Sequence, residues 1–332
     1  MFRVQDFTEN GERVGYTEPG DVHDAIRPPP VGVTRWIDLV DQDADSLELL
    51  RARFDFHPLA IEDCSHLDQR PKLEEYSDVL FVVTHGFCCG EGPVREIEAL
   101  ELHAFLGARF LVTVHQAPVP ELDAAWKRVE QKPTLARRGA DFLYHLVADA
   151  MVDANFPLID KITEELERLT EEVLSEPARE HLARIFALKK ELATMRSVLA
   201  PQREVATALA KLGDEDDGAI AERNGAYFRD MHDHLVRIVE AIDANRELLK
   251  NGTDAYLSAV SNRTNEVMKY LTLMSAVFLP LSFVVGFFGQ NFDDLPFLPG
   301  WNHSRGAMLV MITLCLLVPV GMLGWFKAKR WL

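Results

Sequence analysis

The sequence has few cysteines and lacks the short motifs that mark the common enzyme classes. Its 332 residues include 4 cysteines; Cys88 and Cys89 are adjacent, and no CxxC pair occurs. This spacing fits neither a zinc finger nor a disulfide framework, so we expect reduced thiols. A Gly-x-Ser-x-Gly motif, a P-loop, a dinucleotide-binding fingerprint and an HExxH motif are also missing. These absences argue against an enzyme, and nothing in the sequence calls for a cofactor.

Positive charge is also scarce. The chain has 35 lysines and arginines against 52 aspartates and glutamates, a formal net charge of −17. An acidic domain repels nucleic-acid phosphates and attracts cations, so no nucleic-acid partner is expected. From charge alone, simple solubility is the plainer explanation of the acidic surplus.

The first sixteen residues, MFRVQDFTENGERVGY, contain no apolar run behind a basic start. They therefore do not have the pattern of a secretory signal peptide. We expect the acidic part of the chain to remain in the cytosol.

Two long uncharged runs stand near the C-terminus, at residues 270–289 and 306–326. About twenty apolar residues suffice to cross the hydrocarbon core of a bilayer, and helices inside soluble proteins rarely run this long without charge. Pro280 and Pro319 lie inside the runs, where membrane helices tolerate proline. The sequence therefore predicts two transmembrane helices.

Flanking charges predict the orientation of these helices. Lys269 precedes the first run, and Lys327, Lys329 and Arg330 follow the second, whereas the loop 290–305 has a single cation, Arg305. Lysine and arginine favour the cytosolic side. We expect a multi-pass protein of the plasma (inner) membrane, in contact with lipid, with both termini cytosolic and the loop outside.

One face of the first run is small or polar. Residues at steps of three or four share a helical face. Here that face is made of Asn265, Met268, Thr272, Ser275, Leu279, Ser282 and Gly286. Such a stripe has two interpretations, tight helix–helix packing or the lining of a pore. Two helices cannot enclose a water-filled path, so a pore would require several copies of the chain.

The part before the membrane runs divides into a mixed region and a helical region. Within residues 1–150, strand-like runs stand at 79–87, 96–106 and 109–115, and helical patterns at 46–54 and 59–64. Gly107 and Ala108 fit a hairpin connection, because glycine can supply a positive φ.

Helical periodicity continues through residues 141–174 and 178–199, and Pro201 should end the second of these helices. From about residue 224 to 289, a single helix is predicted, roughly 100 Å long at ~1.5 Å per residue. A helix of that length is not stable alone in water and needs packing partners.

Residues 227–292 and the ending 325–332 resemble the CorA family of divalent metal ion transporters, which includes the related ZntB transporters. Weaker similarity occurs at 57–64, 69–76 and 146–153. The resemblance implies a funnel-shaped homopentamer. Each subunit would have an α/β cytosolic domain (1–150), a helical stalk (151–268) and a two-helix transmembrane pore domain (269–332).

The same resemblance implies that the first span lines the pore, which favours the pore interpretation of the stripe. The family signature Gly-Met-Asn reads Gly289-Gln290-Asn291 here. A ring of Asn291 amides would bind the inner-shell waters of a magnesium ion, which dehydrates reluctantly. ZntB transporters also depart from methionine at this position. Gln290 therefore either leaves the identity of the transported ion open among magnesium, cobalt and zinc, or is a neutral change.

Further roles follow from the family pattern. Met268 and Leu271 match a hydrophobic gate near the cytosolic end of the span, which would exclude a hydrated ion by dewetting. Asp293 and Asp294 would concentrate cations at the entrance, or belong to a solvated loop.

The resemblance also implies a cytosolic metal site. Asp230 matches the family's stalk aspartate, and its partner from a neighbouring subunit falls near Asp78, with Ser77 in strict register. Bound cations would then hold the subunits together, and their loss would open the gate. His232 and His234 suit zinc better than magnesium. Because positions two apart on a helix do not face each other, a solvated face is the preferred interpretation.

Two classes of function remain. The first is a homopentameric transporter or channel for divalent cations. The second is a membrane-anchored metal sensor or interaction protein that does not itself transport. The small and polar stripe argues against the second class.

Overall fold

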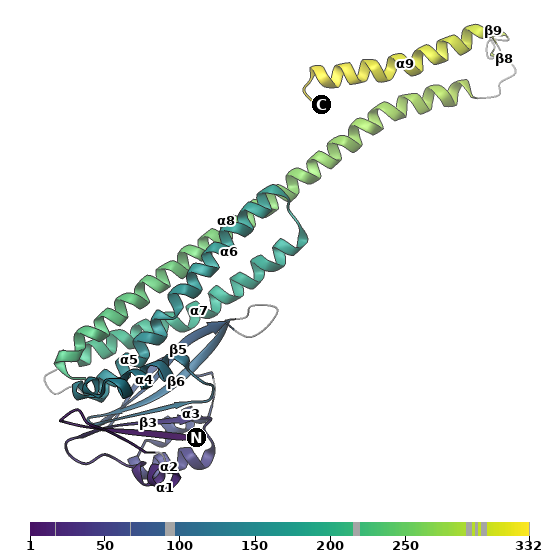
Figure 1. Cartoon of the computed structure of the whole chain (residues 1–332). Coiled ribbons are helices and arrows are strands. Elements are labelled where there is room, and N and C mark those ends of the chain that lie inside the picture. The colour runs from purple at the N-terminus through teal and green to yellow at the C-terminus, as the bar shows by residue number, and fades with distance from the viewer. Residues whose placement is uncertain are drawn as a thin grey trace. The chain divides into compact units, whose positions relative to one another are not determined.

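The computed structural model describes residues 1–332 except 17, 67, 90–96, 215–219, 290–293, 296–297, 300–303 and 332. The chain forms two compact units, Met1–Asp254 and Ala255–Leu332. One long helix, α8 (Glu222–Phe288), contributes residues to both units (Figure 1). The predicted divisions at residues 150 and 268 stay predictions.

A seven-stranded sheet forms the base of the first unit, in the order β2-β1-β3-β7-β6-β5-β4. Neighbouring strands are antiparallel except β3 and β7, which are parallel. The strands are β1 (Phe2–Thr8), β2 (Arg13–Gly15), β3 (Val33–Val40), β4 (Lys72–Tyr76), β5 (Val79–Cys89), β6 (Ile97–Gly107) and β7 (Phe110–His115).

Helices cover both faces of this sheet (Figure 1). On one face α1 (Pro19–Ala25), α2 (Ala44–Phe54) and α3 (Pro58–Ser65) bury a core that includes Ile37, Phe81 and Val112. On the other face lie α4 (Pro120–Gln131), a 3₁₀ helix (Pro133–Arg138) and α5 (Ala140–Asp153). The alternation of side chains along each strand supplies apolar residues to both layers.

The hairpin between β6 and β7 confirms the predicted strands. The reason predicted for Gly107, a positive φ, is wrong. Gly107 pairs with Phe110, so the turn consists of Ala108 and Arg109. Gly107 does not have a positive φ. A Cβ atom there would clash with the Phe110 ring, so the glycine makes room for that ring.

The helical region differs from the sequence prediction at two points. The helical pattern of 141–174 breaks at Ala154 into α5 and α6 (Asn155–Ser175), because the Asn155 amide donates to the carbonyls of Met151 and Val152.

Pro201 does not end its helix. α7 runs from Arg179 to Leu212. Proline removes one helical hydrogen bond. The buried residues Leu199, Gln202 and Val205 lie on both sides of the proline and hold the helix against the rest of the unit.

Gln202 also completes the edge of the sheet. β4 pairs with β5 only as far as Val83, which leaves the main chain of His85 without a strand on that side. The Gln202 side chain accepts from the His85 N–H at 2.8 Å and donates to the His85 carbonyl at 3.0 Å. One amide side chain on α7 therefore replaces a neighbouring strand at this residue.

The prediction of one continuous helix over 224–289 is confirmed by α8. Its apolar stripe is buried in the first unit: Phe228, Met231, Leu235, Ile238 and Ile242. Polar contacts tie α8 to its partner helices. Arg196 of α7 pairs with Asp243 at 2.7 Å, and the Asn245 amide of α8 donates to Thr163 of α6 at 2.9 Å.

The second unit contains the last part of α8 and the helix α9 (Arg305–Ala328). Between them, Asp294–Leu295 (β8) pairs antiparallel with Leu298–Pro299 (β9). The predicted fold class is confirmed: an α/β domain is followed by long helices and by two C-terminal candidate membrane helices.

Candidate cation-handling sites

The two predicted membrane runs lie on α8 and α9. Both helices are long and apolar enough to cross a membrane, by length and composition. Only 6% of the most apolar window of each helix is buried inside the chain. Apolar surface of this extent is left uncovered in a soluble monomer only at a large free-energy cost. Lipid or further copies of the chain would cover it.

The small and polar face of the first run lies in this uncovered region. Leu279 is 73% exposed, and Met268 and Leu271 of the predicted gate are 55% and 57% exposed. All the predicted pore-lining residues are exposed: Asn265, Met268, Leu271, Thr272, Ser275, Leu279, Ser282 and Gly286. The Thr272 hydroxyl donates to the Met268 carbonyl at 2.7 Å, so this polar group is satisfied within its own helix.

The predicted filter falls at the end of α8. Gly289 follows the last helical residue, and its N–H donates to the Val285 carbonyl at 2.8 Å. Gln290, Asn291 and Asp293 lie outside the described residues, and the backbone of Asp294 begins β8. The filter and entrance residues therefore stay predictions.

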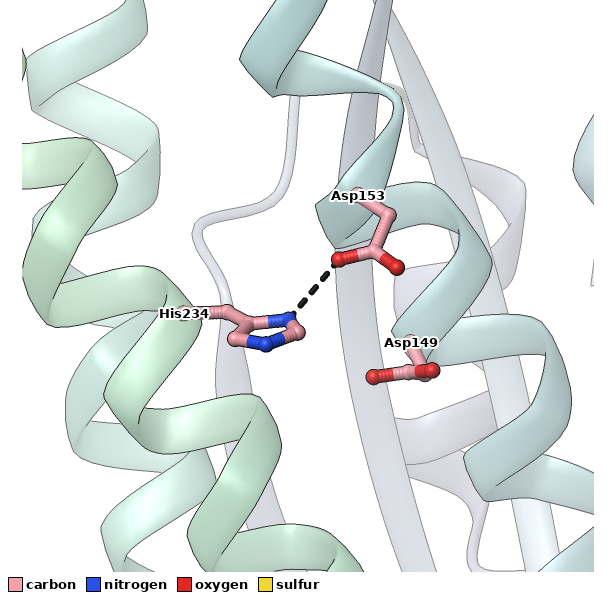
Figure 2. Close-up of side chains that lie close together, drawn as sticks. All are labelled: Asp149, Asp153 and His234. Atoms are coloured by element: carbon pink, nitrogen blue, oxygen red, sulfur yellow. Dashed lines mark hydrogen bonds and ion pairs between the residues drawn. The ribbon is translucent and has the colours of Figure 1, made fainter.

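A second candidate site lies in the first unit, where α5 faces α8. Figure 2 shows Asp149 and Asp153 pointing from α5 toward His234 of α8. One potential ligand atom from each of these three residues lies within 4.8 Å of the other two. The His234 Nδ1 atom is 2.8 Å from Asp153 Oδ1. We call these three residues the acidic–histidine cluster. Carboxylate oxygen and imidazole nitrogen are common ligands of divalent cations.

The helices position the cluster by simple spacing. Asp149 and Asp153 are one turn apart on α5, and the predicted residue Asp230 is one turn from His234 on α8. The Asp230 Oδ2 atom lies 3.9 Å from His234 Nε2. Three carboxylates therefore surround one imidazole, and a divalent cation would reduce their mutual repulsion.

Asp149 is the carboxylate of the cluster whose ionised form is disfavoured by its surroundings. Its burial, together with the nearby charges of Asp153 and Asp230, raises its pKa to about 6 against the attraction of His234. The Asp149 Oδ1 atom is buried and has no hydrogen-bond partner among the described residues. An unpartnered carboxylate oxygen such as Asp149 Oδ1 is a ready ligand for a cation.

One turn before Asp149 on α5, burial lowers the pKa of His145 to about 4.

The remaining predicted residues are only partly brought together. Asp78 lies exposed in the turn between β4 and β5, after Ser77 with a φ of 53°. Among the described residues, no hydrogen bond or ion pair joins Asp78 to Asp230. Their predicted contact is between subunits and stays a prediction.

His234 is half-buried and contacts Asp153 of α5, whereas the half-buried His232 lies 3.2 Å from Asp233 on its own helix. The solvated-face interpretation of these two histidines stays a prediction.

Sequence reasoning missed Asp149 and Asp153 as site residues. A signal was present, because two aspartates one turn apart interrupt the otherwise apolar stretch 146–153. Acidic side chains on a buried helix are rarely there without a partner. The partner, His234, is 81 residues away from Asp153, so only the tertiary structure could join them.

Known proteins support the membrane assignment. The chain is 32% identical over 299 residues to the putative metal ion transporter YfjQ of Bacillus subtilis, covering 89% of each chain. It is 31% identical to the cobalt/magnesium transport protein CorA of Thermotoga maritima, covering 90% of this chain and 83% of that protein.

The fold matches as well. The complete structure of the CorA magnesium transporter from Methanocaldococcus jannaschii superimposes with a TM-score of 0.82 at 18% identity, covering 100% of this chain and 99% of that chain. Residues 32–330 match the family described as CorA-like Mg2+ transporter protein. The chain therefore belongs to the CorA-like family of divalent cation transporters.

Proposed function

We propose that the chain is a homopentameric transporter or channel for divalent cations in the plasma membrane. The observation that carries the proposal is the family match over residues 32–330, which includes both candidate membrane helices. The relatives named above are described as a putative metal ion transporter, a cobalt/magnesium transport protein and a magnesium transporter. Both termini would be cytosolic, because lysines and arginines flank the spans on that side.

Assembly gives the exposed stripe of α8 a role. Two helices per chain cannot surround a path, whereas five copies bring five stripes to one axis. Ser275, Ser282 and Gly286 would then line a narrow polar path, and the more apolar faces of α8 and α9 would meet lipid. Near the cytosolic end, rings of Met268 and Leu271 would form an apolar constriction that closes by dewetting.

The outer mouth would select the ion. A ring of Asn291 amide oxygens would hold a hydrated cation through its inner-shell waters, and Gly289 would allow the close turn out of α8. Gln290 would add a second amide beside this ring. Asp293 and Asp294 would raise the local concentration of cations at the entrance.

The acidic–histidine cluster would regulate the path from the cytosolic side. A cation held by Asp149, Asp153 and His234 would pull α5 and α8 together, and Asp230 would contribute charge. Asp78 of a neighbouring subunit would extend this site across the interface. Cation binding to one arrangement of the subunits shifts the population toward that arrangement. High cytosolic cation would therefore favour a closed pore.

A flux experiment with purified protein in liposomes tests this function. We expect uptake of magnesium, cobalt or zinc above that of empty liposomes, measured with and without a pH gradient. The Gln290→Met variant tests whether residue 290 sets the preference between magnesium and zinc. A folded protein that binds cations but passes none of the three would favour the sensor function instead.

A further inference from the structure

A second group of buried ionisable side chains lies on β5 and β6, on the face covered by α1–α3. His85 and Glu101 are directly opposite each other across the two strands, and His103 is two residues further along β6. His85 is 3% exposed and His103 is 1% exposed. Buried charged groups are rare unless they are paired or bind a cation.

Glu101 lies between the two histidines. Its Oε1 atom is 2.8 Å from His103 Nε2, and its Oε2 atom is 3.4 Å from His85 Nε2. The backbone N–H groups of Asp68 and Gln69 donate to Oε2 at 3.0 and 3.1 Å. Despite burial, which raises it, the two histidines lower the pKa of Glu101 to about 2. The side chain is therefore a carboxylate held in a fixed orientation.

The separation of His85 and Glu101 is long for a hydrogen bond but suits two ligands of one ion. Zinc binds nitrogen and oxygen at about 2.0–2.2 Å, so two donors in a tetrahedral site are roughly 3.4 Å apart. The His85 Nε2 to Glu101 Oε2 distance is 3.4 Å. The other ring nitrogen of His85 is buried and has no hydrogen-bond partner among the described residues.

The pair opens onto a cavity of about 730 Å³. His85 and Glu101 line it from the sheet, Asp68 lines it from the loop after α3, and Thr194 and Ser197 line it from α7. A cation could therefore enter from the cavity and keep bound water as further ligands. His103 would hold Glu101 from behind, as partners of metal ligands commonly do.

We propose that His85 and Glu101, together with bound water, form a binding site for zinc or a similar borderline cation such as cobalt. Imidazole favours these ions over magnesium, which prefers oxygen ligands and water. The site is separate from the acidic–histidine cluster and does not depend on whether the chain transports. Because Gln202 of α7 holds the main chain of His85, a bound ion would also lie beside the contact between the sheet and α7.

Cation binding to the full-length purified protein tests the site. The background is the triple variant Asp149→Asn/Asp230→Asn/His234→Asn, which removes the acidic–histidine cluster and the Asp230 side of the predicted contact between subunits. In this folded background, equilibrium dialysis should show one zinc ion per subunit that a large excess of magnesium does not displace. Cobalt should give the visible absorption of a tetrahedral or five-coordinate site. A cation bound in a pore shared by all subunits would instead give one ion per assembly, which distinguishes it from one ion per subunit.

Variants of the site then assign its ligands. His85→Gln and Glu101→Gln in the same background should weaken zinc binding by about tenfold or more. His23→Gln, a change of an exposed histidine on α1, should leave it unchanged. The proposal is overturned if the folded background binds no zinc per subunit, or if His85→Gln binds as tightly as the background. Zinc binding by the background protein is measured with His85 and Glu101 intact. That result therefore remains informative even if His85→Gln or Glu101→Gln fails to fold.

Discussion

The His234 Nδ1 atom of α8 lies 2.8 Å from the Asp153 Oδ1 atom of α5, which joins the long helix to the helix that packs on the sheet. This contact belongs to the acidic–histidine cluster, which lies between α5 and α8. Under the proposed function, a cation bound there would act on the helix that continues into the predicted pore.

Asp149→Asn should change stability in opposite directions with and without cations. The folded-state pKa of Asp149, about 6, is above its ordinary value of 3.8, so the charged form destabilises the cation-free protein. This destabilisation sets in as pH rises from 3.8 to about 6. With a chelator at pH above 7, the variant should be more stable than wild type by about 1 kcal/mol, since the group is partly exposed and screened.

Added cobalt or magnesium should reverse this order, because only wild type gains the bound ion. Thermal unfolding in detergent measures both conditions. Asp160→Asn, which changes an exposed aspartate on α6, is the matched control and should follow wild type. If cations raise the midpoint of Asp149→Asn as much as that of wild type, the cluster does not bind them.

Gln202→Leu should destabilise the first unit by ~2–4 kcal/mol, because it leaves the buried N–H and carbonyl of His85 without partners. Denaturant unfolding followed by tryptophan fluorescence reports on this unit through Trp36 and Trp126, whose rings are 4.8 Å apart. Gln131→Leu, at an exposed position on α4, should change little. A loss below about 0.5 kcal/mol for Gln202→Leu would show that water replaces the side chain without penalty.

His115→Gln should flatten the pH dependence of stability above neutral pH. The His115 ring lies with Nδ1 2.6 Å from the Ala117 carbonyl and Nε2 3.2 Å from Asp38 Oδ1. Burial lowers its pKa, but these two acceptors outweigh burial and raise it above 6.5. The protonated ring therefore stabilises the fold below that value, and this stabilisation is lost as pH rises through the raised pKa. Unfolding midpoints of wild type and variant from about pH 6 to 9 should converge at the alkaline end. Parallel curves would contradict the ion pair.

Ser282→Phe should reduce cation flux by about an order of magnitude, because five bulky rings would fill the proposed path. Leu316→Phe on α9 is the control for bulk on a membrane helix outside the stripe, and it should keep the wild-type rate. Both proteins are reconstituted in liposomes at equal density. Equal flux through Ser282→Phe would mean that the stripe packs against other helices and does not line the path.

Much of the fold follows from local patterns in the sequence. Short strand-like runs located β5, β6 and β7, and long uncharged runs located both candidate membrane helices, because these signals depend only on neighbouring residues. The errors came where tertiary contacts override local preference. Burial around Gln202 carries α7 through Pro201, and the Asn155 amide ends α5 within a helical pattern.

The residues of the candidate sites also differ in whether the sequence alone could identify them. Asp230 was expected from the resemblance to the family, whereas Asp149 and Asp153 were identified only from their position beside His234 in the structure. The His85–Glu101 pair needed the strand register between β5 and β6. Local sequence does not specify which strands are neighbours.

Flux through the Asn291→Ala variant tests the central claim most directly. Wild type, Asn291→Ala and the loop control Asn302→Ala are reconstituted in liposomes, and uptake of magnesium, cobalt and zinc is measured. Divalent cation transport through an asparagine ring predicts flux in wild type and Asn302→Ala, and its loss for every transported ion in Asn291→Ala. Unchanged flux in Asn291→Ala would contradict the asparagine ring, and no flux in any of the three proteins would contradict transport itself.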